Sequence, residues 1–423
     1  MKPVFRTVYW NWPSTLVKDS KKVATEIMKY PTLDNIDCHG KTVFVRVDYN
    51  VSLTNDGQVR DDARIRASLP TLTELRKKGA KLILASHLGR PKGRVDSKFT
   101  LLPVAKRLAE LLEVEVLALE NCIGMEVKKL INDAKENQVI LLENLRFHPE
   151  EEACDEGFSQ KLSELAQIYV NDAFGTMHRA HASTVGMVKF FKEHAIGRLV
   201  ENEVGFLSRL LHEPEKPYVV ILGGAKISDK IDVIKNLINV ADKILVGGGM
   251  AYTFLLAQGH KVGKSLVEES KVSLAKRLME RAQIKGVNLL LPVDSIIAEK
   301  FAPDASSRVV SNEDDWADWM GLDIGPQTVT KFKEAIAGAK TVFWNGPMGV
   351  YEMPAFQKGT DAVAEFVAES GAMTVVGGGD SLAAVNQSGF SSKISHMSTG
   401  GGASLEFLEG KDLPGLKAIE TEK

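Results

Sequence analysis

Short runs of β-branched and apolar residues alternate with longer amphipathic stretches along most of the chain. The run KTVFVRVDY predicts a buried strand. SLPTLTELRKKG predicts a following helix, with Ser68 as its N-cap, Pro70 in its first turn and Gly79 just past its end. The rhythm continues through KLILASH, TLLPVAKRLAELLE, VEVLAL, MEVKKLINDAKE, QVILLEN, FSQKLSELA and IYVNDAF. Strands that alternate with helices indicate βα units and a parallel sheet with helices on both faces.

The alternation of strands and helices stops at IGRLVENEVGFLSRLLHEPEKP. This segment predicts one amphipathic helix followed by a break at Pro214 and Pro217. A second series then begins, with the strands YVVILGG, KILVGGG, NLLLPVDS, TVFWNGP and MTVVGGGD. We therefore expect an α/β fold of two Rossmann-like lobes, each a parallel sheet with helices on both faces, joined by an interdomain helix and hinge. The expected division is an N-terminal extension 1–30, a first lobe 31–198, a connecting helix and hinge 199–217, a second lobe 218–398, and a C-terminal segment 399–423 that packs back on the first lobe.

The bulk composition is that of an ordinary globular protein. The chain has 423 residues, 44% hydrophobic and 26% charged, and this length suits two domains of about 200 residues each. A net charge of −2 argues against a general nucleic-acid binder. No apolar run approaches the roughly 18 residues of a membrane span, so no membrane association is expected.

The first 30 residues carry Lys2 and Arg6 but no continuous apolar region or small-residue cleavage site, so a signal peptide is not expected. An accessory helix over residues 14–30 is the simpler interpretation, although a targeting role for this extension stays open. The three cysteines are odd in number, far apart and lack metal-ligand spacing. They predict reduced thiols and a cytoplasmic protein.

Basic residues recur in the first half where predicted strands end. They are Arg46, Arg64, Arg66, His87, Arg90, Lys92, Arg94, Arg146, His148, His178, Arg179 and His181. The carboxyl ends of parallel strands meet at one edge of a sheet, and arginine pairs bidentately with phosphate or carboxylate. The set predicts a substrate with several negative charges, although a surface salt bridge would explain any single arginine. An HxxH metal pair lacks a third ligand and is not favoured. The run EEE at 150–152 is expected to be a solvated loop.

Glycine-rich turns follow strands in the second half. GGAKISDK, GGGD and STGGGASLE each precede a predicted helix, and such turns let backbone N–H groups approach a phosphate. Two other motifs fail their templates. GHKVGKS is not a P-loop because Gln258 stands where glycine is required, and GGGMAY is not a dinucleotide turn because position 252 is Tyr252.

The ordered motifs VRVDYNV, SHLGRP, ENLRFH, GTMHRAH, GGAKISDK, GGGMAYTF, WMGLDIGP, WNGPMGVYE, VVGGGDS and STGGGASLE resemble those of the phosphoglycerate kinase family over residues 33–415. The resemblance implies reversible phosphoryl transfer between ATP and the carboxylate of 3-phosphoglycerate, which gives 1,3-bisphosphoglycerate and ADP. It also implies Mg²⁺ as part of the nucleotide complex and a monomeric enzyme. Small departures are Tyr49, Ser52, Met177 and Ser381, none of which removes a charge that the reaction needs.

The resemblance also implies roles for single residues. The phosphoglycerate would be bound by Asp48, Asn50, Arg64, His87, Arg90, Arg146 and Arg179. The nucleotide would be bound by Gly224, Ala225, Lys226, Lys230, Gly248, Leu322, Asn345, Glu352, Gly378, Gly379, Asp380 and Ser381, with Asp380 at the magnesium position. Lys226 and Arg64 would act in catalysis by offsetting charge on the moving phosphoryl group.

A carboxylate acceptor is already ionised at neutral pH, so no general base is expected, and positioning and electrostatics should carry the reaction. Nucleotide and acceptor lie on different lobes in this interpretation, so the lobes should close by a hinge motion. One alternative is a two-domain dehydrogenase, which needs a G-x-G-x-x-G turn and an acidic ribose ligand that are not found. The other is an anion-binding module without turnover.

Overall fold

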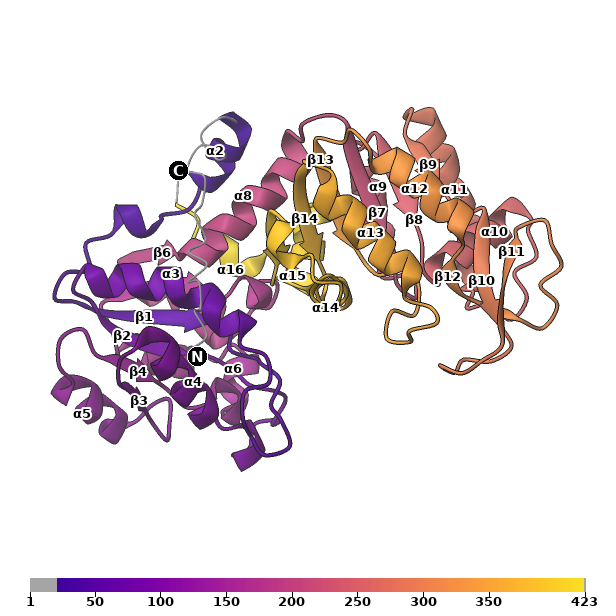
Figure 1. Ribbon diagram of the computed structural model, residues 1–423. Helices are drawn as coiled ribbons and strands as arrows, with labels where there is room; N and C mark the ends of the chain where they lie inside the picture. The colour runs from indigo at the N-terminus through magenta and orange to yellow at the C-terminus, as the bar shows by residue number, and fades with distance from the viewer. Residues whose placement is uncertain (1–20, 422–423) are drawn as a thin grey trace, which may run out of the picture.

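A computed structural model describes residues 21–421 and shows two lobes joined by a long helix (Figure 1). The sheet of the first lobe has six strands in the order β3-β4-β2-β1-β5-β6, and its paired strands are parallel. Phe44 of β1 packs in one core cluster, while Val43 and Val45 pack in another on the opposite face. Both faces are therefore buried, as is usual in parallel sheets. The strands are β1 (Thr42–Val47), β2 (Lys81–Ala85), β3 (Val116–Ala118), β4 (Val139–Leu141), β5 (Ile168–Asp172) and β6 (Glu193–Ile196).

Helices of the first lobe follow the expected order, but the first of them begins earlier than predicted. The helices are α3 (Ala63–Lys77), α4 (Leu102–Leu112), α5 (Met125–Asp133), α6 (Pro149–Glu152) and α7 (Glu156–Ser163). The predictions of Ser68 as N-cap and of Pro70 in the first turn are wrong, because both lie inside α3. The extra turn carries Ile65, which is fully buried, and Ser68 donates its hydroxyl hydrogen to the carbonyl of Ile65. Gly79 does lie just past the helix, in the left-handed region at φ +82°.

The second lobe repeats the architecture with a six-stranded sheet in the order β15-β14-β13-β7-β8-β9, and its paired strands are parallel. Its strands are β7 (Tyr218–Leu222), β8 (Lys243–Val246), β9 (Asn288–Leu290), β13 (Thr341–Asn345), β14 (Met373–Gly377) and β15 (His396–Ser398). Its helices are α9 (Ile231–Leu237), α10 (Met250–Gln258), α11 (Val272–Ile284), α12 (Pro326–Ile336), α13 (Lys358–Glu369) and α14 (Gly379–Gln387). The expected fold class of two parallel-sheet lobes is thus confirmed.

Several elements were not predicted. The strands β6 and β15 extend the two sheets at their edges. The second lobe also carries a small antiparallel sheet in the order β11-β10-β12, formed by β11 (Ser307–Ser311), β10 (Asp294–Ala298) and β12 (Met320–Ile324). The prediction of one strand over NLLLPVDS is wrong. The segment holds β9 of the parallel sheet and the start of β10 of the antiparallel sheet, with Pro292 between them. GHKVGKS is a loop, as predicted.

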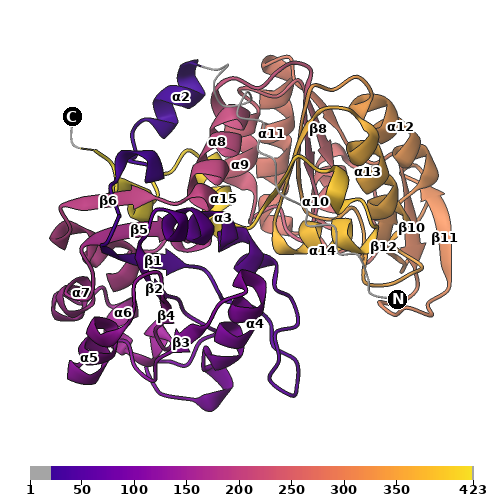
Figure 2. The ribbon, with the colours of Figure 1, turned by 60° about the vertical axis from the view of Figure 1, so that its left-hand side comes forward.

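A single helix, α8 (Arg198–His212), links the lobes where the connecting helix was predicted. Helix α2 (Lys21–Ile27) packs on it through the buried Val23 and Ile27 (Figure 2). The helix expected over 14–30 is observed only over these residues, and positions 14–20 lie outside the described part. From residue 21 to residue 421, no helix combines the length and apolarity that crossing a membrane would take.

The last part of the described chain returns to the first lobe. Helices α15 (Gly402–Leu408) and α16 (Pro414–Lys417) follow β15. The Gly415 N–H donates to the Met177 carbonyl at 2.8 Å, and the Thr421 N–H donates to the Lys29 carbonyl at 2.9 Å. Residues from the two ends of the described chain therefore lie next to each other (Figure 2).

Candidate active site

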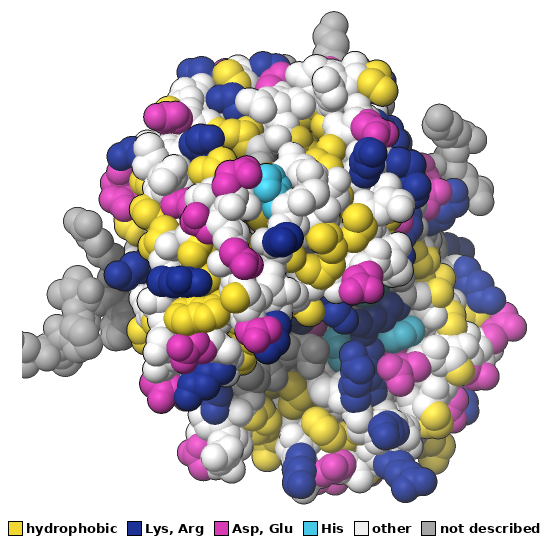
Figure 3. Space-filling view, turned by 90° about the vertical axis from the view of Figure 1, so that its right-hand side faces the viewer, with side chains coloured by type: hydrophobic (Ala, Val, Ile, Leu, Met, Phe, Trp, Pro, Cys, Tyr) yellow, Lys and Arg dark blue, Asp and Glu magenta, His cyan; other side chains and the backbone are white. Residues whose placement is uncertain are grey.

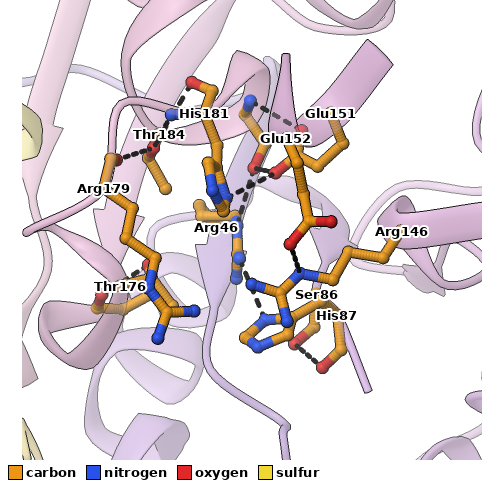
Figure 4. Close-up of polar contacts among 12 residues, drawn as sticks. Arg46, Ser86, His87, Arg146, Glu151, Glu152, Thr176, Arg179, His181 and Thr184 are labelled. Atoms are coloured by element: carbon orange, nitrogen blue, oxygen red, sulfur yellow. Dashed lines mark hydrogen bonds and ion pairs between the residues drawn. The ribbon is translucent and has the colours of Figure 1, made fainter. Parts of the chain in front are cut away.

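The carboxyl-terminal edge of the first sheet gathers the basic residues that the sequence analysis singled out. Arg46 is in β1, His87 follows β2, Arg146 lies in the short helix η3 (Leu145–Phe147) after β4, and Arg179 follows β5. Figure 4 shows these four side chains directed into one region. His87 lies close enough for Arg46, Arg146 and Arg179 all to lower its pKa electrostatically. The convergence expected from parallel-strand geometry is therefore present.

Arg46 is almost fully buried, at 1% exposure, and its donors are used within the protein. Its Nε donates to Ser183 Oγ at 2.8 Å, and its Nη1 donates to the Val47 carbonyl. Its Nη2 lies 3.3 Å from Nδ1 of His87. Arg46 therefore orients other groups of this edge.

Asp48 and Asn50 hold the loops around the same edge. Asp48 Oδ2 pairs with Arg64 Nη1 at 2.5 Å, and Asn50 Oδ1 accepts from the Gly89 N–H at 2.9 Å. Arg146 Nη1 donates to the Gly89 carbonyl at 3.0 Å. These contacts join Arg64 to Asp48, and they join Asn50 to Arg146 through Gly89. Arg90 is an exposed neighbour of Gly89, and Arg179 donates through Nε to His178 at 3.2 Å.

The acidic run at 150–152 is not a solvated loop, and that prediction is wrong. Residues Pro149–Glu152 form helix α6, and Glu151 is fully buried. Glu151 accepts from the Ser183 hydroxyl at 2.5 Å and from the Ser183 N–H at 3.0 Å. Its neighbour Glu152 is exposed and lies 3.1 Å from Nε of Arg146. The side chains of this run alternate because a helix turn points them in different directions.

Burial sets the charge state of several groups at this edge. It lowers the pKa of His87 well below its usual value, with Asp48 opposing the effect and Arg46 adding to it. Burial likewise lowers the pKa of His181 to about 4, with help from Arg146 and Arg46. Burial opposes ionisation of Asp48 too, but Arg64, His87 and Arg46 outweigh it and hold its pKa below the ordinary value. The edge therefore combines neutral histidines with charged arginines at neutral pH.

Glycine turns of the second lobe meet at the carboxyl ends of β7, β8 and β13. Gly224 and Gly248 both have positive φ, and their N–H groups donate to the carbonyls of Pro347 and Met348, each at 2.9 Å. A Cβ at Gly248 would come within 2.6 Å of the Gly224 nitrogen, so these turns touch backbone to backbone. Only glycine fits this approach.

The turn after β14 is built in the same region. Asn345 accepts from Lys230 Nζ and donates to the Gly377 carbonyl at 2.8 Å. The Gly346 N–H donates to the buried hydroxyl of Ser381 at 2.5 Å. Gly378 precedes α14 with φ +92°, and the predicted helix is present but begins at Gly379, inside the run GGGD. Burial lowers the pKa of Lys230, while the charge of Asp380 opposes the shift, so Asp380 lies near this ammonium group.

The remaining predicted nucleotide residues surround these turns less tightly. Ala225 and Lys226 are exposed in the turn after β7, and Glu352 is exposed in the loop after β13. Glu352 and Asp380 both lie near Tyr351, whose pKa rises mainly through burial. Leu322 is largely buried in β12, and its carbonyl accepts from the Val350 N–H at 2.9 Å, which ties this strand to the loop that carries Glu352.

The predicted turn STGGG, which follows β15, also touches the first lobe. A Cβ on Gly175 would meet Asp48 Oδ2 at 2.9 Å and the Thr399 carbonyl at 3.3 Å. Figure 3 shows a hollow between the lobes with Lys, Arg and His side chains gathered beside it. Gly175 therefore lies between Asp48 and Thr399, so the carboxyl-terminal edge of the first sheet adjoins the segment after β15.

Sequence reasoning missed a second set of polar residues, near the connecting helix. Glu203 of α8 is fully buried, accepts from the Thr399 N–H at 2.8 Å and lies 2.9 Å from Nε2 of His396. The ring of His396 stacks on Phe206 with centroids 4.5 Å apart. Glu203 lies three residues after Val200 and four before Leu207, on the apolar stripe of the helix, so a glutamate at this position was the available signal. For Glu151, Pro149 at a helix start was the available signal.

Comparisons with known proteins agree with the geometry. A sequence model of the family described as Phosphoglycerate kinase matches residues 33–411. A phosphoglycerate kinase of Anaeromyxobacter dehalogenans (strain 2CP-C) is 57% identical over 396 residues, which cover 93% of this chain and all of that protein. One of Acidobacterium capsulatum is 54% identical over 401 residues, covering 93% of this chain and 99% of that protein.

Solved structures give the same result. The phosphoglycerate kinase from Coxiella burnetii superposes with a TM-score of 0.84 at 40% identity, covering 92% of this chain and 98% of that one. The enzyme from Pyrococcus horikoshii OT3 superposes with a TM-score of 0.80 at 33% identity and the same coverage. These matches confirm the resemblance found in the ordered motifs and give no support to a two-domain dehydrogenase. The chain belongs to the phosphoglycerate kinase family.

Proposed function

We propose that the chain catalyses reversible phosphoryl transfer between ATP and the carboxylate of 3-phosphoglycerate, which gives 1,3-bisphosphoglycerate and ADP. The observation that carries this proposal is the gathering of Arg146 and Arg179 around a neutral His87, at a sheet edge that adjoins the segment after β15. A small molecule with a phosphate and a carboxylate suits two guanidinium groups, each of which pairs bidentately with one anion. The family membership gives the proposal its substrate.

On the acceptor side, the proposed ligands are Asp48, Asn50, Arg64, His87, Arg90, Arg146 and Arg179. The ion pair of Arg64 with Asp48 supports this assignment, because it holds the Arg64 guanidinium beside this edge of the sheet through Nη1 alone. Since the acceptor carboxylate is already ionised, the chemistry needs positioned positive charge and no base. The neutral histidines of the edge can then serve as hydrogen-bond donors without adding a titrating charge.

On the nucleotide side, the proposed ligands are Gly224, Ala225, Lys226, Lys230, Gly248, Leu322, Asn345, Glu352, Gly378, Gly379, Asp380 and Ser381. The helix start at Gly379 supports phosphate binding there, because the first N–H groups of α14 point outward and carry partial positive charge. The partly buried hydrogen bond from Lys230 to Asn345 supports a preformed arrangement of this turn.

We propose Mg²⁺ at Asp380. Among the described residues, no group of three or more His, Cys, Asp or Glu side chains could cage a metal ion. A single carboxylate beside phosphate-binding turns fits Mg²⁺, which binds proteins through one or two carboxylates and keeps the nucleotide phosphates and water as its other ligands. When bound, the ion would neutralise charge on the nucleotide phosphates.

Two residues are proposed to act on the transferring group itself. Lys226 is exposed in the turn after β7 and has room to follow the phosphoryl group. Arg64 would approach from the acceptor side. Charge stabilisation by such groups is the main catalytic contribution in phosphoryl transfer, where the protein otherwise positions the reactants.

The domain division expected from the sequence becomes a proposal of the same kind: extension 1–30, first lobe 31–198, connector 199–217, second lobe 218–398 and returning segment 399–423. The contacts of Gly415 and Thr421 with the first lobe support the last assignment. We propose that the lobes close about the connector during turnover and exclude water, as hinge motions do in other kinases. We further propose a cytoplasmic location, which three free cysteines support, and a monomer, which follows from the family resemblance.

A coupled assay tests the function directly. The protein is mixed with ATP, Mg²⁺ and 3-phosphoglycerate, and added glyceraldehyde-phosphate dehydrogenase converts the product with loss of NADH. We expect NADH loss that depends on the protein, on both substrates and on the added dehydrogenase. No turnover above the protein-free blank would contradict the proposal, and binding of 3-phosphoglycerate without turnover would favour the anion-binding module.

A further inference from the structure

Glu151 has no role in the assignments above, yet it is fully buried behind the acceptor edge. A buried carboxylate is unfavourable unless its oxygens are paired. Both oxygens of Glu151 accept from one residue, Ser183, through the hydroxyl at 2.5 Å and the backbone N–H at 3.0 Å. Burial raises the pKa of Glu151, while the charge of Arg46 and the bonds from Ser183 oppose the shift. Glu151 therefore fixes Ser183 in one orientation.

Ser183 passes this orientation to Arg46. Because the Ser183 hydroxyl donates its only hydrogen to Glu151, its oxygen is left as an acceptor, and Arg46 Nε donates to it at 2.8 Å. Ser183 lies in the π-helical turn η5 (Ala182–Gly186), whose carbonyl at the same residue accepts from Tyr169. Three hydrogen bonds therefore hold Ser183 in place, so its hydroxyl oxygen accepts from the guanidinium of Arg46 in one fixed position.

Arg46 in turn sets the tautomer of His87. A guanidinium has donors and no acceptor, and it stays protonated. With Arg46 Nη2 at 3.3 Å, Nδ1 of His87 must be the acceptor, so the single proton of the neutral ring sits on Nε2. Figure 4 shows the ring of His87 beside Arg46, with the guanidinium groups of Arg146 and Arg179 on its two sides. The ring therefore presents an N–H donor to whatever anion binds there.

We propose that Glu151 is a positioning residue of the acceptor site, which acts through Ser183 and Arg46 to hold His87 as a neutral Nε2–H donor toward the bound phosphoglycerate. The proposal rests on the proposed function for the identity of the anion. It goes beyond that function by giving Glu151, which would not touch the substrate, a role in orienting a residue that would.

The variant Glu151→Gln separates this proposal from a simple electrostatic effect. Removing a negative charge near an anion site would, by the field alone, tighten binding and lower KM for 3-phosphoglycerate. Loss of positioning has the opposite sign, because an amide cannot accept from both donors of Ser183 and the serine turns. We expect KM for 3-phosphoglycerate to rise about tenfold, with kcat reduced less than threefold and KM for Mg-ATP unchanged.

Two further variants serve as controls. Glu150→Gln removes the same charge from the exposed neighbouring position and should leave every kinetic constant as in the wild type. Ser183→Ala breaks the connection without changing any charge and should raise KM for 3-phosphoglycerate to a similar extent. Thermal unfolding of each variant checks that the fold is retained.

The tautomer gives a readout that does not depend on turnover. In the wild type labelled with ¹⁵N-histidine, His87 should show an unprotonated Nδ1 and a protonated Nε2, and Glu151→Gln should mix the two tautomers. An unchanged His87 spectrum in Glu151→Gln, a lowered KM, or a parallel loss of kcat, both KM values and thermal stability would overturn the proposal. If the wild type showed no turnover, the proposed function would fail while the His87 spectrum still tested the connection.

Discussion

The protonation of Asp172 offers a quantitative test of how burial controls stability. Asp172 ends β5, is fully buried, and accepts through Oδ1 from the Leu199 N–H at 2.9 Å, at the start of α8. The positive end of a helix favours a carboxylate there. Burial outweighs this effect of the helix and raises the pKa of Asp172 from 3.8 to about 7. A Cβ at Gly197 would come within 2.2 Å of Oδ1, so the carboxyl group is enclosed and water cannot replace the missing solvation.

The sign of the pH dependence follows from the direction of this shift. Below pH 3.8 the Asp172 carboxyl is protonated in both the folded and the unfolded chain, so it does not lower the free energy of unfolding. Between that value and about 7 the unfolded chain releases the proton while the folded chain keeps it, so stability falls as pH rises. Above the folded pKa the loss levels off at about 4 kcal/mol, from a shift of about three units.

The experiment compares wild type with Asp172→Asn, which keeps the shape and the acceptor for Leu199 but cannot ionise. Urea unfolding at pH 5 and pH 8 gives the free energy of unfolding of each protein, and the difference between them cancels the other titrating groups. Relative to the variant, the wild type should lose roughly 2–3 kcal/mol of stability between pH 5 and pH 8. Asp133→Asn, which removes an exposed carboxylate at the end of α5, serves as the control for the substitution itself. A gap between wild type and Asp172→Asn that is the same at both pH values would refute the reasoning.

Three further outcomes are expected. Lys226→Ala should lower kcat roughly 100- to 1000-fold with KM values within a few-fold of wild type in the coupled assay, and a near-normal kcat would remove Lys226 from catalysis. Asp380→Asn should shift the Mg²⁺ dependence of the rate at fixed ATP to about tenfold higher concentration, and an unchanged Mg²⁺ titration would place the ion elsewhere. Leu207→Ala, at a fully buried position of the connecting helix, should cost about 2–5 kcal/mol in urea unfolding, whereas a smaller loss would show that neighbouring side chains fill the cavity.

Element type was predictable from the sequence wherever a segment was long enough to show a period. The connecting helix has four buried apolar positions at helical spacing, Val200, Val204, Leu207 and Leu210, and it was found in the right place. The strand β15 has three residues, and β6 has four with an exposed glutamate at its start. Such short edge strands carry no alternation that distinguishes them from loops.

The candidate site was predictable to the extent that its chemistry sits at strand ends. His87 follows β2 and Arg146 follows β4, and the sheet topology places these two strands side by side although β3 lies between them in the sequence. Glu151 could not be found in this way, because three consecutive glutamates have the same letter and only the helix turn decides which one is buried. The pairing of Glu203 with Thr399 depends on two segments almost 200 positions apart, a separation over which local patterns carry no information.

The return of the chain to the first lobe also has a consequence for how the protein is made. Phe174, at the end of β5, packs against Phe407 of α15 with ring centroids 6.3 Å apart, and Met177 holds the backbone of Gly415. The apolar side chains of Phe174 and Met177 therefore lack this cover on the ribosome until residues 198–421 have followed, roughly 10 to 45 s at ordinary rates of synthesis. During that interval the nascent first lobe exposes apolar surface that only the last residues of the chain can cover.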